Sequence, residues 1–324
     1  MKAFWIRNEG NGTVLEPREL AAPAPGPGQL LMTVRAASLN RGDLLGTIRH
    51  HRTDVARPAG VDASGEVAAL GPGVTGFAVG ERIMVRSKGC FAEQVLVEVE
   101  QAVRIPDRLT WEQAAAAPIA YITAYEALFQ FGHLAKDEWV LIPGISSGVG
   151  VAALQIAKAA GAHVIGVSGS AEKLAVLEPM GMDAGIVARG GDFAQQAIDA
   201  TDGRGVDIAV DLVGGSAFPA CLASLRNHGR LAMVGYVDGQ LKAEIDLEAV
   251  HGKRLHIFGV SNAAIDKAQR ALSMQLFIRD ILPMLADGRV VPVVDKVFPF
   301  DQLPAAKAYV EGSALLGKVV VRMS

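Results

Sequence analysis

A glycine-rich segment, residues 139–153, carries residue types suited to binding a phosphate group. An apolar run predicts a strand, a run of small residues predicts a turn, and the next residues predict a helix. Gly148, Gly150 and Ala153 match the spacing G-x-G-x-x-G/A of a dinucleotide-binding turn. Small residues let a pyrophosphate approach the backbone, and free N–H groups at a helix start attract negative charge. The alternative is a turn that only packs. The residues that we predict to bind a dinucleotide from this segment are Gly144, Ser146, Ser147, Gly148, Val149 and Gly150.

The same segment contains a second motif. Residues 144–148 read G-x-S-x-G, which in an α/β-hydrolase places a nucleophilic serine on a sharp strand-to-helix turn. Ser146 would be the nucleophile, and Asp211 and His228 follow in the required order. Against this alternative, the chain before the turn is rich in short strands, and a serine nucleophile does not need Gly150. His228 also lies in a segment that resembles the turn at the end of a helix.

The next predicted strand indicates which dinucleotide would bind. About twenty residues after the turn, NAD-binding proteins place an acid that binds the ribose hydroxyls. Here the apolar run 164–167 ends at Ser168, and the next acid is Glu172. A missing carboxylate removes repulsion toward a 2′-phosphate, and Lys173 supplies attraction. These residues favour NADPH. Arg189 is a second, weaker candidate for the phosphate contact, and Lys173 taken alone would also suit an ordinary solvent-exposed helix position.

Two regions of different character must position these residues. In the first hundred residues, short apolar stretches separated by Pro and Gly predict a barrel-like β domain. From residue 139 onward strands and helices alternate, and uninterrupted apolar strands are typical of a doubly wound parallel sheet. The strands predicted in the first region are 30–35, 65–69, 82–85 and 92–97. Those in the second are 139–142, 164–167, 206–212, 231–234 and 255–260, with helices at 148–160, 171–180, 192–200 and 216–227.

Further elements join and close these regions. Thr110 stands at the N-cap of a helix-like run, 111–131, which Pro118 must break or kink. A long helix is predicted at 266–286. Strands predicted at 290–294 and 318–322 suggest that the chain returns to the first domain.

Composition excludes several classes of function. The 324 residues suffice for about two domains, and 31 Lys and Arg against 34 Asp and Glu give a formal net charge of −3. This balance does not favour binding to nucleic acid or to an anionic membrane. Cys90 and Cys221 are too few for a disulfide framework. Because the sequence also lacks a signal-peptide pattern and a membrane-spanning apolar run, we expect a soluble, cytoplasmic protein.

Seven motifs in order resemble those of a known family. They are residues 36–43 (AASLNRGD), 60–67 (GVDASGEV), 71–82 with its VGER, 91–93 (FAE), 123–128 (TAYEAL), the glycine-rich turn and 315–321 (LLGKVVV). The chain resembles a medium-chain dehydrogenase/reductase, most closely the zinc-free quinone oxidoreductase (zeta-crystallin-like) branch. This resemblance implies a GroES-like β-barrel domain over 1–122, completed by 263–324, and an inserted Rossmann domain over 123–262. It also implies NADPH bound between the domains, and a homodimer.

The resemblance assigns roles outside the glycine-rich turn. It implies that Asn40 positions the acceptor or the nicotinamide, and that Thr123 contacts the nicotinamide end. Either side chain could instead be structural, closing a turn or capping a helix. Ser147 departs from the glycine usual in the family, and residues 44–46 (Leu, Leu, Gly) stand where quinone reductases often carry a tyrosine. The ends of the later strands should expose backbone to the cofactor at Gly235, Tyr236, Phe258, Gly259 and Val260, although Phe258 could equally belong to the sheet core.

No metal site is predicted. The zinc-ligand positions of the related alcohol dehydrogenases match Asn40, residues 61–62 and Ile119, and none of these is Cys or His. Neither do His50 and His51, which we expect on a solvated loop, have ligand spacing. Quinones and polarised alkenes accept hydride without a Lewis acid, whereas alcohols are hard to oxidise without one.

The expected function is therefore metal-free hydride transfer from NADPH to a quinone-like acceptor. A reductase of alkenals or enoyl thioesters and a non-catalytic NADPH-binding protein remain alternatives. The sequence identifies no general acid, although Tyr121, Tyr125 and Tyr236 are possible proton donors.

Overall fold

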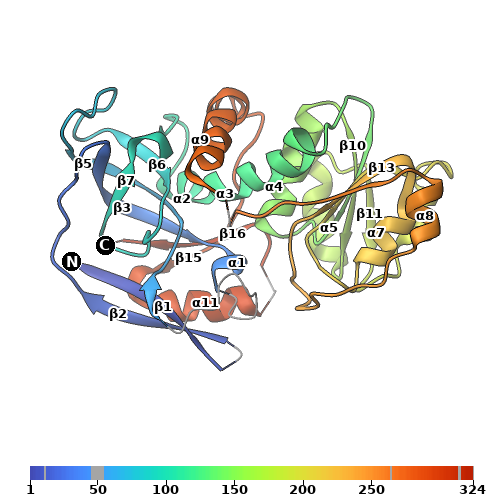
Figure 1. The fold of residues 1–324 in the computed structure, drawn as a ribbon, viewed down its shortest axis with the longest axis horizontal. Coiled ribbons are helices and arrows are strands. Elements are labelled where there is room, and N and C mark those ends of the chain that lie inside the picture. Colours follow the sequence, from blue (N-terminus) through green and yellow to red (C-terminus); the bar gives the residue numbers. More distant parts are fainter. Residues whose placement is uncertain (11, 45–54, 263–264, 313–314, 324) are drawn as a thin grey trace. The chain divides into compact units, whose positions relative to one another are not determined.

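The chain forms two compact units. The computed structural model describes residues 1–10, 12–44, 55–262, 265–312 and 315–323. Unit 1 comprises Met1–Ala120 and Ala263–Ser324, and unit 2 comprises Tyr121–Asn262 (Figure 1). Unit 2 is thus an insertion in the chain of unit 1. The sequence predicts the first boundary two residues later, between residues 122 and 123.

Unit 1 is built around a long strand, β3 (Gln29–Leu39). β3 pairs antiparallel with β5 (Asp62–Leu70), β7 (Gln94–Glu98) and β16 (Lys318–Arg322). The predicted return of the chain to the first domain is therefore confirmed by β16. The larger sheet has the order β15-β16-β3-β5-β6-β8, and its other strands are β6 (Arg82–Arg86), β8 (Ala102–Arg104) and β15 (Val294–Pro299). A smaller sheet has the order β2-β1-β4, with β1 (Lys2–Glu9), β2 (Gly12–Glu19) and β4 (Arg57–Pro58).

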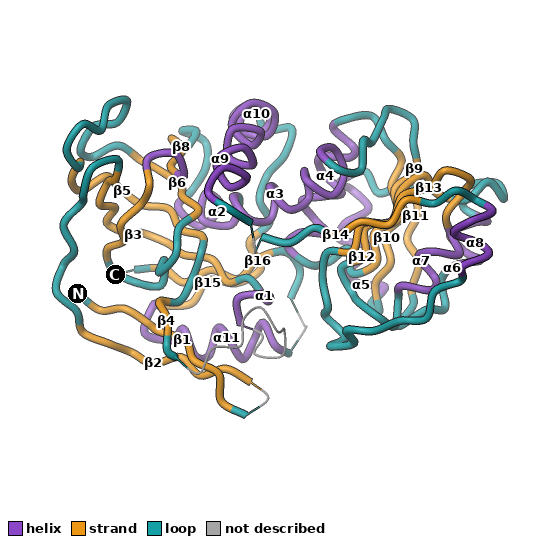
Figure 2. Tube along the Cα trace, viewed as in Figure 1, coloured by secondary structure: helices purple, strands orange, loops and turns teal. Residues whose placement is uncertain are grey.

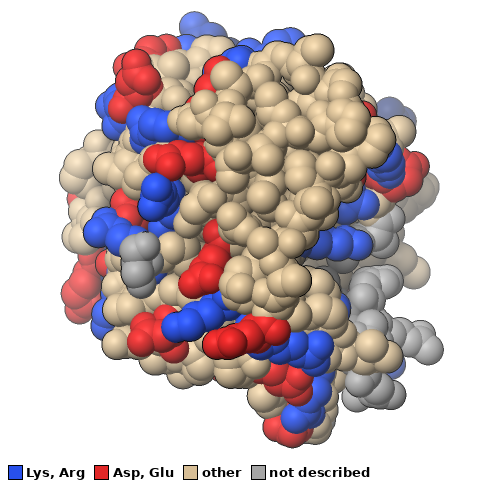
Figure 3. Space-filling view, turned by 90° about the vertical axis from the view of Figure 1, so that its left-hand side faces the viewer, with Lys and Arg blue, Asp and Glu red and all other residues tan. Residues whose placement is uncertain are grey.

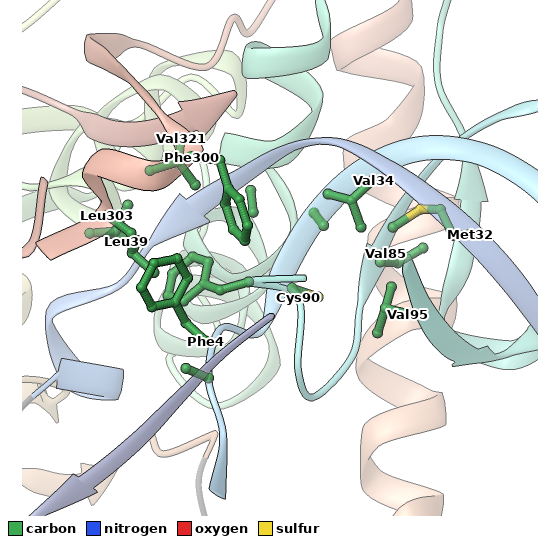
Figure 4. Close-up of a cluster of buried hydrophobic side chains, with 14 of the residues drawn as sticks. Phe4, Met32, Val34, Leu39, Val85, Cys90, Val95, Phe300, Leu303 and Val321 are labelled. Atoms are coloured by element: carbon green, nitrogen blue, oxygen red, sulfur yellow. The ribbon is translucent and has the colours of Figure 1, made fainter. Parts of the chain in front are cut away.

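The core of unit 1 joins segments that are far apart in the sequence. Phe4 and Phe300 meet edge to face with ring centroids 5.3 Å apart. Figure 4 shows them beside Leu39, Leu303 and Val321 in one buried cluster. The N-terminal strand and the C-terminal helix thus share one core. The helices of unit 1 are α1 (Arg41–Leu44), α2 (Trp111–Ala116), α9 (Lys267–Leu276), α10 (Leu282–Asp287) and α11 (Leu303–Glu311).

The helical run predicted at 111–131 is confirmed, and it breaks at the proline. Thr110 caps α2 reciprocally with Gln113, because each side chain accepts the other's backbone N–H, at 3.2 and 3.1 Å. The proline then begins α3 (Pro118–Tyr125), which continues as a π-helical turn, Glu126–Gln130. The predicted helix 266–286 is likewise present as α9, a π-helical turn and α10.

Unit 2 contains a six-stranded parallel sheet. In spatial order its strands are β11 (Ala184–Val187), β10 (His163–Ser168), β9 (Trp139–Pro143), β12 (Val206–Asp211), β13 (Leu225–Met233) and β14 (His256–Gly259). Numbered along the chain, these strands have the order 3-2-1-4-5-6 of a Rossmann fold. The order in which successive strands are added changes side between β9 and β12. Because all neighbours are parallel, the carboxyl ends of the strands share one edge. The predicted doubly wound sheet is confirmed.

Helices flank this sheet (Figure 2). They are α4 (Gly148–Ala159), α5 (Ala171–Leu177), α6 (Ala194–Asp199), α7 (Phe218–Ser224) and α8 (Leu247–Gly252). α4 packs on β9 and β10, whereas α7 packs on β12 and β13. The strands between them are therefore buried, which is why their sequences are uninterrupted apolar runs.

Two predicted elements are wrong in their bounds. The strand predicted at 290–294 is in fact β15, which starts at Val294, because Pro292 cannot donate to a ladder. The helix predicted at 216–227 ends at Ser224, and β13 begins at the next residue. The predicted turn around His228 is instead an irregularity within β13, where the register shifts and His228 adopts a φ of +59°.

The surface of unit 1 mixes charges of both signs. On the face shown in Figure 3, basic and acidic side chains are interspersed among the described residues. Ion pairs such as Arg18 with Glu16 (3.1 Å) and Arg35 with Glu66 (2.9 Å) belong to this unit. Within the ranges described above, no helix has the length and apolar character needed to cross a bilayer.

Candidate cofactor and acceptor sites

The glycine-rich turn lies at the carboxyl end of β9, where the strand order reverses. Gly144 leaves the strand with a φ of +75°, and its N–H donates to the Val167 carbonyl at 3.0 Å. Ser147 is the N-cap of α4, and its Oγ accepts the Gly150 N–H at 3.1 Å. At the first two helical positions, Gly148 and Val149, helix geometry provides no acceptor within the helix. These two N–H groups are the natural donors for an anion.

Gly150 allows α4 to approach its own turn closely. A Cβ on Gly150 would lie 2.5 Å from the carbonyl oxygen of Ile145 and 2.7 Å from that residue's Cα. Since both atoms are backbone, a side chain could not be accommodated without moving the turn. The glycine pattern predicted from the sequence therefore has a steric cause. The turn also lies close to the loop after β12, because a Cβ added to Gly144 would be 3.3 Å from the Val213 side chain.

The end of β10 brings Ser168 and Arg189 together. Ser168 is buried, and its Oγ accepts the Ser170 N–H at 3.3 Å. Ser170 caps α5, with its Oγ accepting the Lys173 N–H at 3.3 Å. The Arg189 side chain runs over Gly169, where a Cβ would come within 2.8 Å of Arg189 Nε. Arg189 thus lies directly at the turn after β10, whereas Lys173 is half-buried on the first turn of α5.

Asp211 organises the loop at the end of β12. Its Oδ1 accepts the N–H groups of Val213 (2.8 Å) and Gly214 (2.9 Å). Its Oδ2 is buried and has no hydrogen-bond partner among the described residues. Burial raises the pKa of Asp211 to about 6, against the lowering effect of the two N–H donors. The backbone carbonyl of Asp211 also accepts the N–H of Gly235, which fixes the predicted Gly235 beside it at 3.1 Å; the half-buried Tyr236 follows.

The end of β14 lies at the same edge. Gly259 pairs with Met233 in the sheet, and the buried Val260 donates its N–H to the Met233 carbonyl at 2.9 Å. The half-buried Phe258 packs against Phe131, with ring centroids 6.3 Å apart. The predicted residues Gly235, Gly259 and Val260 therefore share the carboxyl edge with the glycine-rich turn.

Thr123 is tied to a residue that the sequence analysis missed. Asn262 Nδ2 donates to Thr123 Oγ1 at 2.8 Å. Thr123 is buried on α3, and Asn262 follows the end of β14. Asn262 could have been identified from the sequence, because it is a polar residue just after a predicted apolar strand.

In unit 1, Asn40 belongs to a polar cluster at the end of β3. Its Nδ2 donates to Asp62 Oδ2 at 2.9 Å, and Lys318 Nζ donates to its Oδ1 at 2.5 Å. Asp62 also accepts Ser38 Oγ–H at 3.2 Å and the Ile119 N–H at 3.1 Å. Burial raises the pKa of Asp62, while the Lys318 ammonium, 3.6 Å away, acts in the opposite direction. Sequence reasoning found Asn40 and missed Asp62 and Lys318 as its partners.

This cluster does not suit a metal ion. Only Asp62 offers a carboxylate, and the Lys318 ammonium already balances its charge. Among the residues that the structure describes, no group of three or more His, Cys, Asp or Glu side chains could hold a metal. His50 and His51, and the positions Leu45 and Gly46 that lack a tyrosine, lie outside the described residues.

The serine-hydrolase alternative is wrong on geometric grounds. Ser146 follows the carboxyl end of β9, whereas His228 lies near the amino end of β13. In parallel strands these ends are at opposite edges of the sheet, so the two side chains cannot form a catalytic pair. Asp211 is likewise engaged with its own loop.

Comparison with known proteins agrees with this architecture. The family described as "Alcohol dehydrogenase GroES-like domain" matches residues 26–107, and that described as "Zinc-binding dehydrogenase" matches residues 148–276. The chain is 31% identical to the synaptic vesicle membrane protein VAT-1 homolog of Rattus norvegicus, across 95% of this chain and 80% of that protein. It is 34% identical to a mycocerosic acid synthase-like polyketide synthase of Mycobacterium tuberculosis, across 86% of this chain and 14% of that protein.

Solved structures extend the likeness to the whole chain. Mycobacterial Rv1454c complexed with NADPH has a TM-score of 0.89 at 25% identity, over 99% of this chain and 100% of that one. The CurK enoyl reductase has a TM-score of 0.87 at 25% identity, over 99% of each chain. A mycobacterial quinone oxidoreductase has a TM-score of 0.84 at 25% identity, again over 99% of each. The chain belongs to the medium-chain dehydrogenase/reductase family of oxidoreductases, in the branch that contains the quinone oxidoreductases.

Proposed function

We propose that this protein transfers a hydride from NADPH to a quinone-like acceptor without a metal ion. One observation carries the proposal: the glycine-rich turn stands where the strand order of the unit 2 sheet reverses, with Ser168 in place of an acid on the next strand. Dinucleotides bind at such a reversal in open α/β sheets. The mycobacterial structure complexed with NADPH, which has the same fold over the whole chain, supports the choice of cofactor.

The turn is suited to the pyrophosphate because its donors are backbone groups. The N–H groups of Gly148 and Val149 lie at the positive end of α4. The Ser147 side chain accepts the Gly150 N–H, so the N–H groups of Gly148 and Val149 are the ones that would bind an anion. Ser146 is half-buried in the turn and contributes shape rather than a nucleophile.

Arg189 is the better candidate for the 2′-phosphate of NADPH. Its side chain lies over Gly169, between the buried Ser168 and the N-cap of α5. A guanidinium there offers bidentate hydrogen bonds to a phosphate, and no carboxylate stands at the end of β10 to repel it. Lys173 would add charge from the first turn of α5. The ranking inferred from the sequence, Lys173 before Arg189, is thus reversed in this proposal.

The chain's own side chains would orient the reaction rather than perform it. NADPH, when bound, supplies the hydride. Asn40 would donate a hydrogen bond to the acceptor, and Thr123, held by Asn262, would support the nicotinamide end. A Lewis acid has no suitable ligand set at Asn40, Asp62 and Ile119, which supports a metal-free reaction.

Reduction of an alkenal or enoyl thioester is the second candidate, favoured by the likeness to the CurK enoyl reductase. Such a reaction benefits from a placed proton donor. Tyr121 is unsuited to that role, because its buried hydroxyl donates to Gln155 Oε1 at 2.9 Å and burial raises its pKa. The Tyr125 ring packs against Phe129, with ring centroids 5.3 Å apart and an interplanar angle of 32°. Tyr236 is half-buried at the cofactor edge and is the donor that this alternative would require.

We also propose that two copies pair through β14. This strand is the edge of the unit 2 sheet, and three of its four residues are exposed. An edge strand offers unpaired backbone groups to an identical partner. Sedimentation of the purified protein, compared with an Ile257→Lys variant, should give a dimer and a monomer respectively.

The proposed reaction is tested by comparing acceptors in the presence of a chelator. We would measure kcat/KM with NADPH for a benzoquinone, an alkenal and an enoyl thioester, each with and without EDTA. We expect the quinone to be the best acceptor and EDTA to have no effect.

Other outcomes would change the assignment. A tenfold advantage of the enoyl thioester, removed by Tyr236→Phe, would replace the quinone by the alkene. Binding of NADPH with no turnover of any acceptor would indicate a non-catalytic NADPH-binding protein. Loss of turnover in EDTA, restored by zinc, would contradict the metal-free reaction.

A further inference from the structure

The amide of Asn40 is held at both ends by buried charged groups. Lys318 Nζ donates to Oδ1 at 2.5 Å, and Nδ2 donates to Asp62 Oδ2 at 2.9 Å. The two charged residues are 6% and 0% exposed. An ammonium only donates and a carboxylate only accepts, so the amide has one possible orientation. This is a rigid setting for a side chain that itself is half-buried.

Four separate segments are needed to build this setting. Asn40 follows β3, Asp62 begins β5, Ile119 lies in the first turn of α3, and Lys318 begins β16. Asp62 accepts hydrogen bonds from Ser38, Asn40 and Ile119 besides its ion pair with Lys318. Burying an ion pair rarely stabilises a fold more than apolar residues of the same volume would. Stability alone therefore gives little reason for this arrangement.

The arrangement leaves one donor for a ligand. A primary amide has two N–H bonds, and only one of those of Asn40 is used by Asp62. The positive charge on the Oδ1 side draws electron density from the amide, which makes the remaining N–H a stronger donor. A carbonyl oxygen that gains negative charge is the acceptor that profits most from such a donor.

We propose that Lys318 is a positioning residue of the proposed reaction: it fixes and polarises the Asn40 amide so that its remaining N–H binds the acceptor's carbonyl oxygen. This role rests on the proposed function. As hydride adds to the quinone, the carbonyl oxygen takes the electron pair, Asn40 donates a hydrogen bond to it, and water supplies the proton. Lys318 itself neither gains nor loses a proton in this scheme.

The test uses the full-length protein with the double substitution Asp62→Asn/Lys318→Met. Removing both charges avoids leaving a lone charge buried, so the fold is retained, which thermal unfolding checks. We expect kcat/KM for benzoquinone to fall 10- to 100-fold and the KD for NADPH, measured by titration, to stay within twofold. Affinity for naphthoquinone without nucleotide, measured by tryptophan quenching, should fall as well. Lys296→Met, the same change at an exposed position on β15, is the control and should leave kcat/KM, the KD for NADPH and the affinity for naphthoquinone unchanged.

A double-mutant cycle separates positioning from general damage. Asn40→Ala should lower kcat/KM by a similar factor, and adding Asp62→Asn/Lys318→Met to it should cost less than threefold more. Two outcomes would overturn the role of Lys318 and leave the proposed function standing. One is a triple variant whose loss of kcat/KM equals the product of the losses of Asn40→Ala and Asp62→Asn/Lys318→Met. The other is a folded Asp62→Asn/Lys318→Met variant with wild-type kcat/KM. Wild-type protein that binds NADPH but reduces no acceptor would overturn both.

Discussion

The two regions that carry the proposed chemistry are built in opposite ways. The cofactor turn of unit 2 is made of backbone from one short stretch, residues 144–150, and its donors are N–H groups. The Asn40 cluster of unit 1 is made mostly of side chains, and its groups come from four distant segments. The Asn40 amide and the Lys318 ammonium are its central donors, and the Ser38 hydroxyl and the Ile119 backbone N–H also donate to Asp62. A backbone site tolerates changes of side-chain chemistry but not of volume. A side-chain cluster is instead sensitive to changes of side-chain chemistry, because each charge is balanced by another.

The largest expected effect breaks the charge balance of the Asn40 cluster. Asp62→Ala leaves the Lys318 ammonium buried without its carboxylate, so we expect a loss of about 3–5 kcal/mol in the free energy of unfolding. Chemical denaturation measures it. Asp62→Ala/Lys318→Met should recover most of the loss. If the double variant is no more stable than Asp62→Ala, the charge-balance account of this cluster is wrong.

A change of volume should have the next largest effect, in the cofactor turn. Gly150→Ala places a Cβ against the backbone of Ile145, so we expect about 1–3 kcal/mol of destabilisation and at least tenfold weaker NADPH binding. Gly252→Ala is the matched control, since a Cβ there meets nothing within 4 Å. Thermal unfolding and nucleotide titration check both variants. Wild-type NADPH affinity in a folded Gly150→Ala protein would contradict the close approach of α4 to its turn.

Asp211 links pH to stability in unit 2. Its pKa is raised to about 6 from 3.8, so the folded state binds the proton more tightly than the unfolded state does. The contribution of Asp211 to the free energy of unfolding therefore decreases as pH rises from about 4 to about 6, and it stays constant above pH 6. Asp211→Asn cannot ionise and can still accept the Val213 and Gly214 N–H groups. We expect it to be more stable than wild type by about 3 kcal/mol at pH 7, and the difference to vanish near pH 4. A pH-independent difference in denaturation free energy would contradict the assignment.

The smallest effects concern the two serines of the turn. Ser147→Ala removes the cap of the Gly150 N–H and should cost about 1 kcal/mol, with NADPH binding weakened less than tenfold. Ser146→Ala removes a side chain without a capping role and should stay within about 0.5 kcal/mol of wild type. Calorimetric unfolding distinguishes them. Equal losses in both variants would mean that Ser147 does not act as the cap.

The difference between the regions also explains what the sequence could predict. The cofactor turn is contiguous, so its strand, glycines and helix cap are visible as one motif, and the parallel sheet follows from apolar runs. Asn40 was found only through the family resemblance. Its partners Asp62 and Lys318 are 22 and 278 positions away in the chain, and no local pattern connects them.

The predicted ends of helices and strands were wrong where the local sequence favours one structure and tertiary pairing imposes another. The start of β13 has the residues of a helix end, yet Leu225 pairs with Val206, and Arg226 binds the buried Asp207 carboxylate. β15 is mostly exposed, so its residues 294–299 lack the apolar run that was expected at 290–294. Pairing and ion pairs of this kind involve segments that no window of sequence contains.

A dinucleotide site in unit 2 that selects for the 2′-phosphate is the central feature of the proposed function. The measurement is the affinity of the wild-type protein for NADPH and NADH by calorimetric titration, repeated with Arg189→Ala, Lys173→Ala and, as a control at the opposite edge of the sheet, Lys136→Ala. We predict NADPH to bind at least tenfold more tightly than NADH, Arg189→Ala to remove most of that preference, and Lys136→Ala to preserve it. Equal affinity of the wild-type protein for both nucleotides, or no binding of either, would contradict the account.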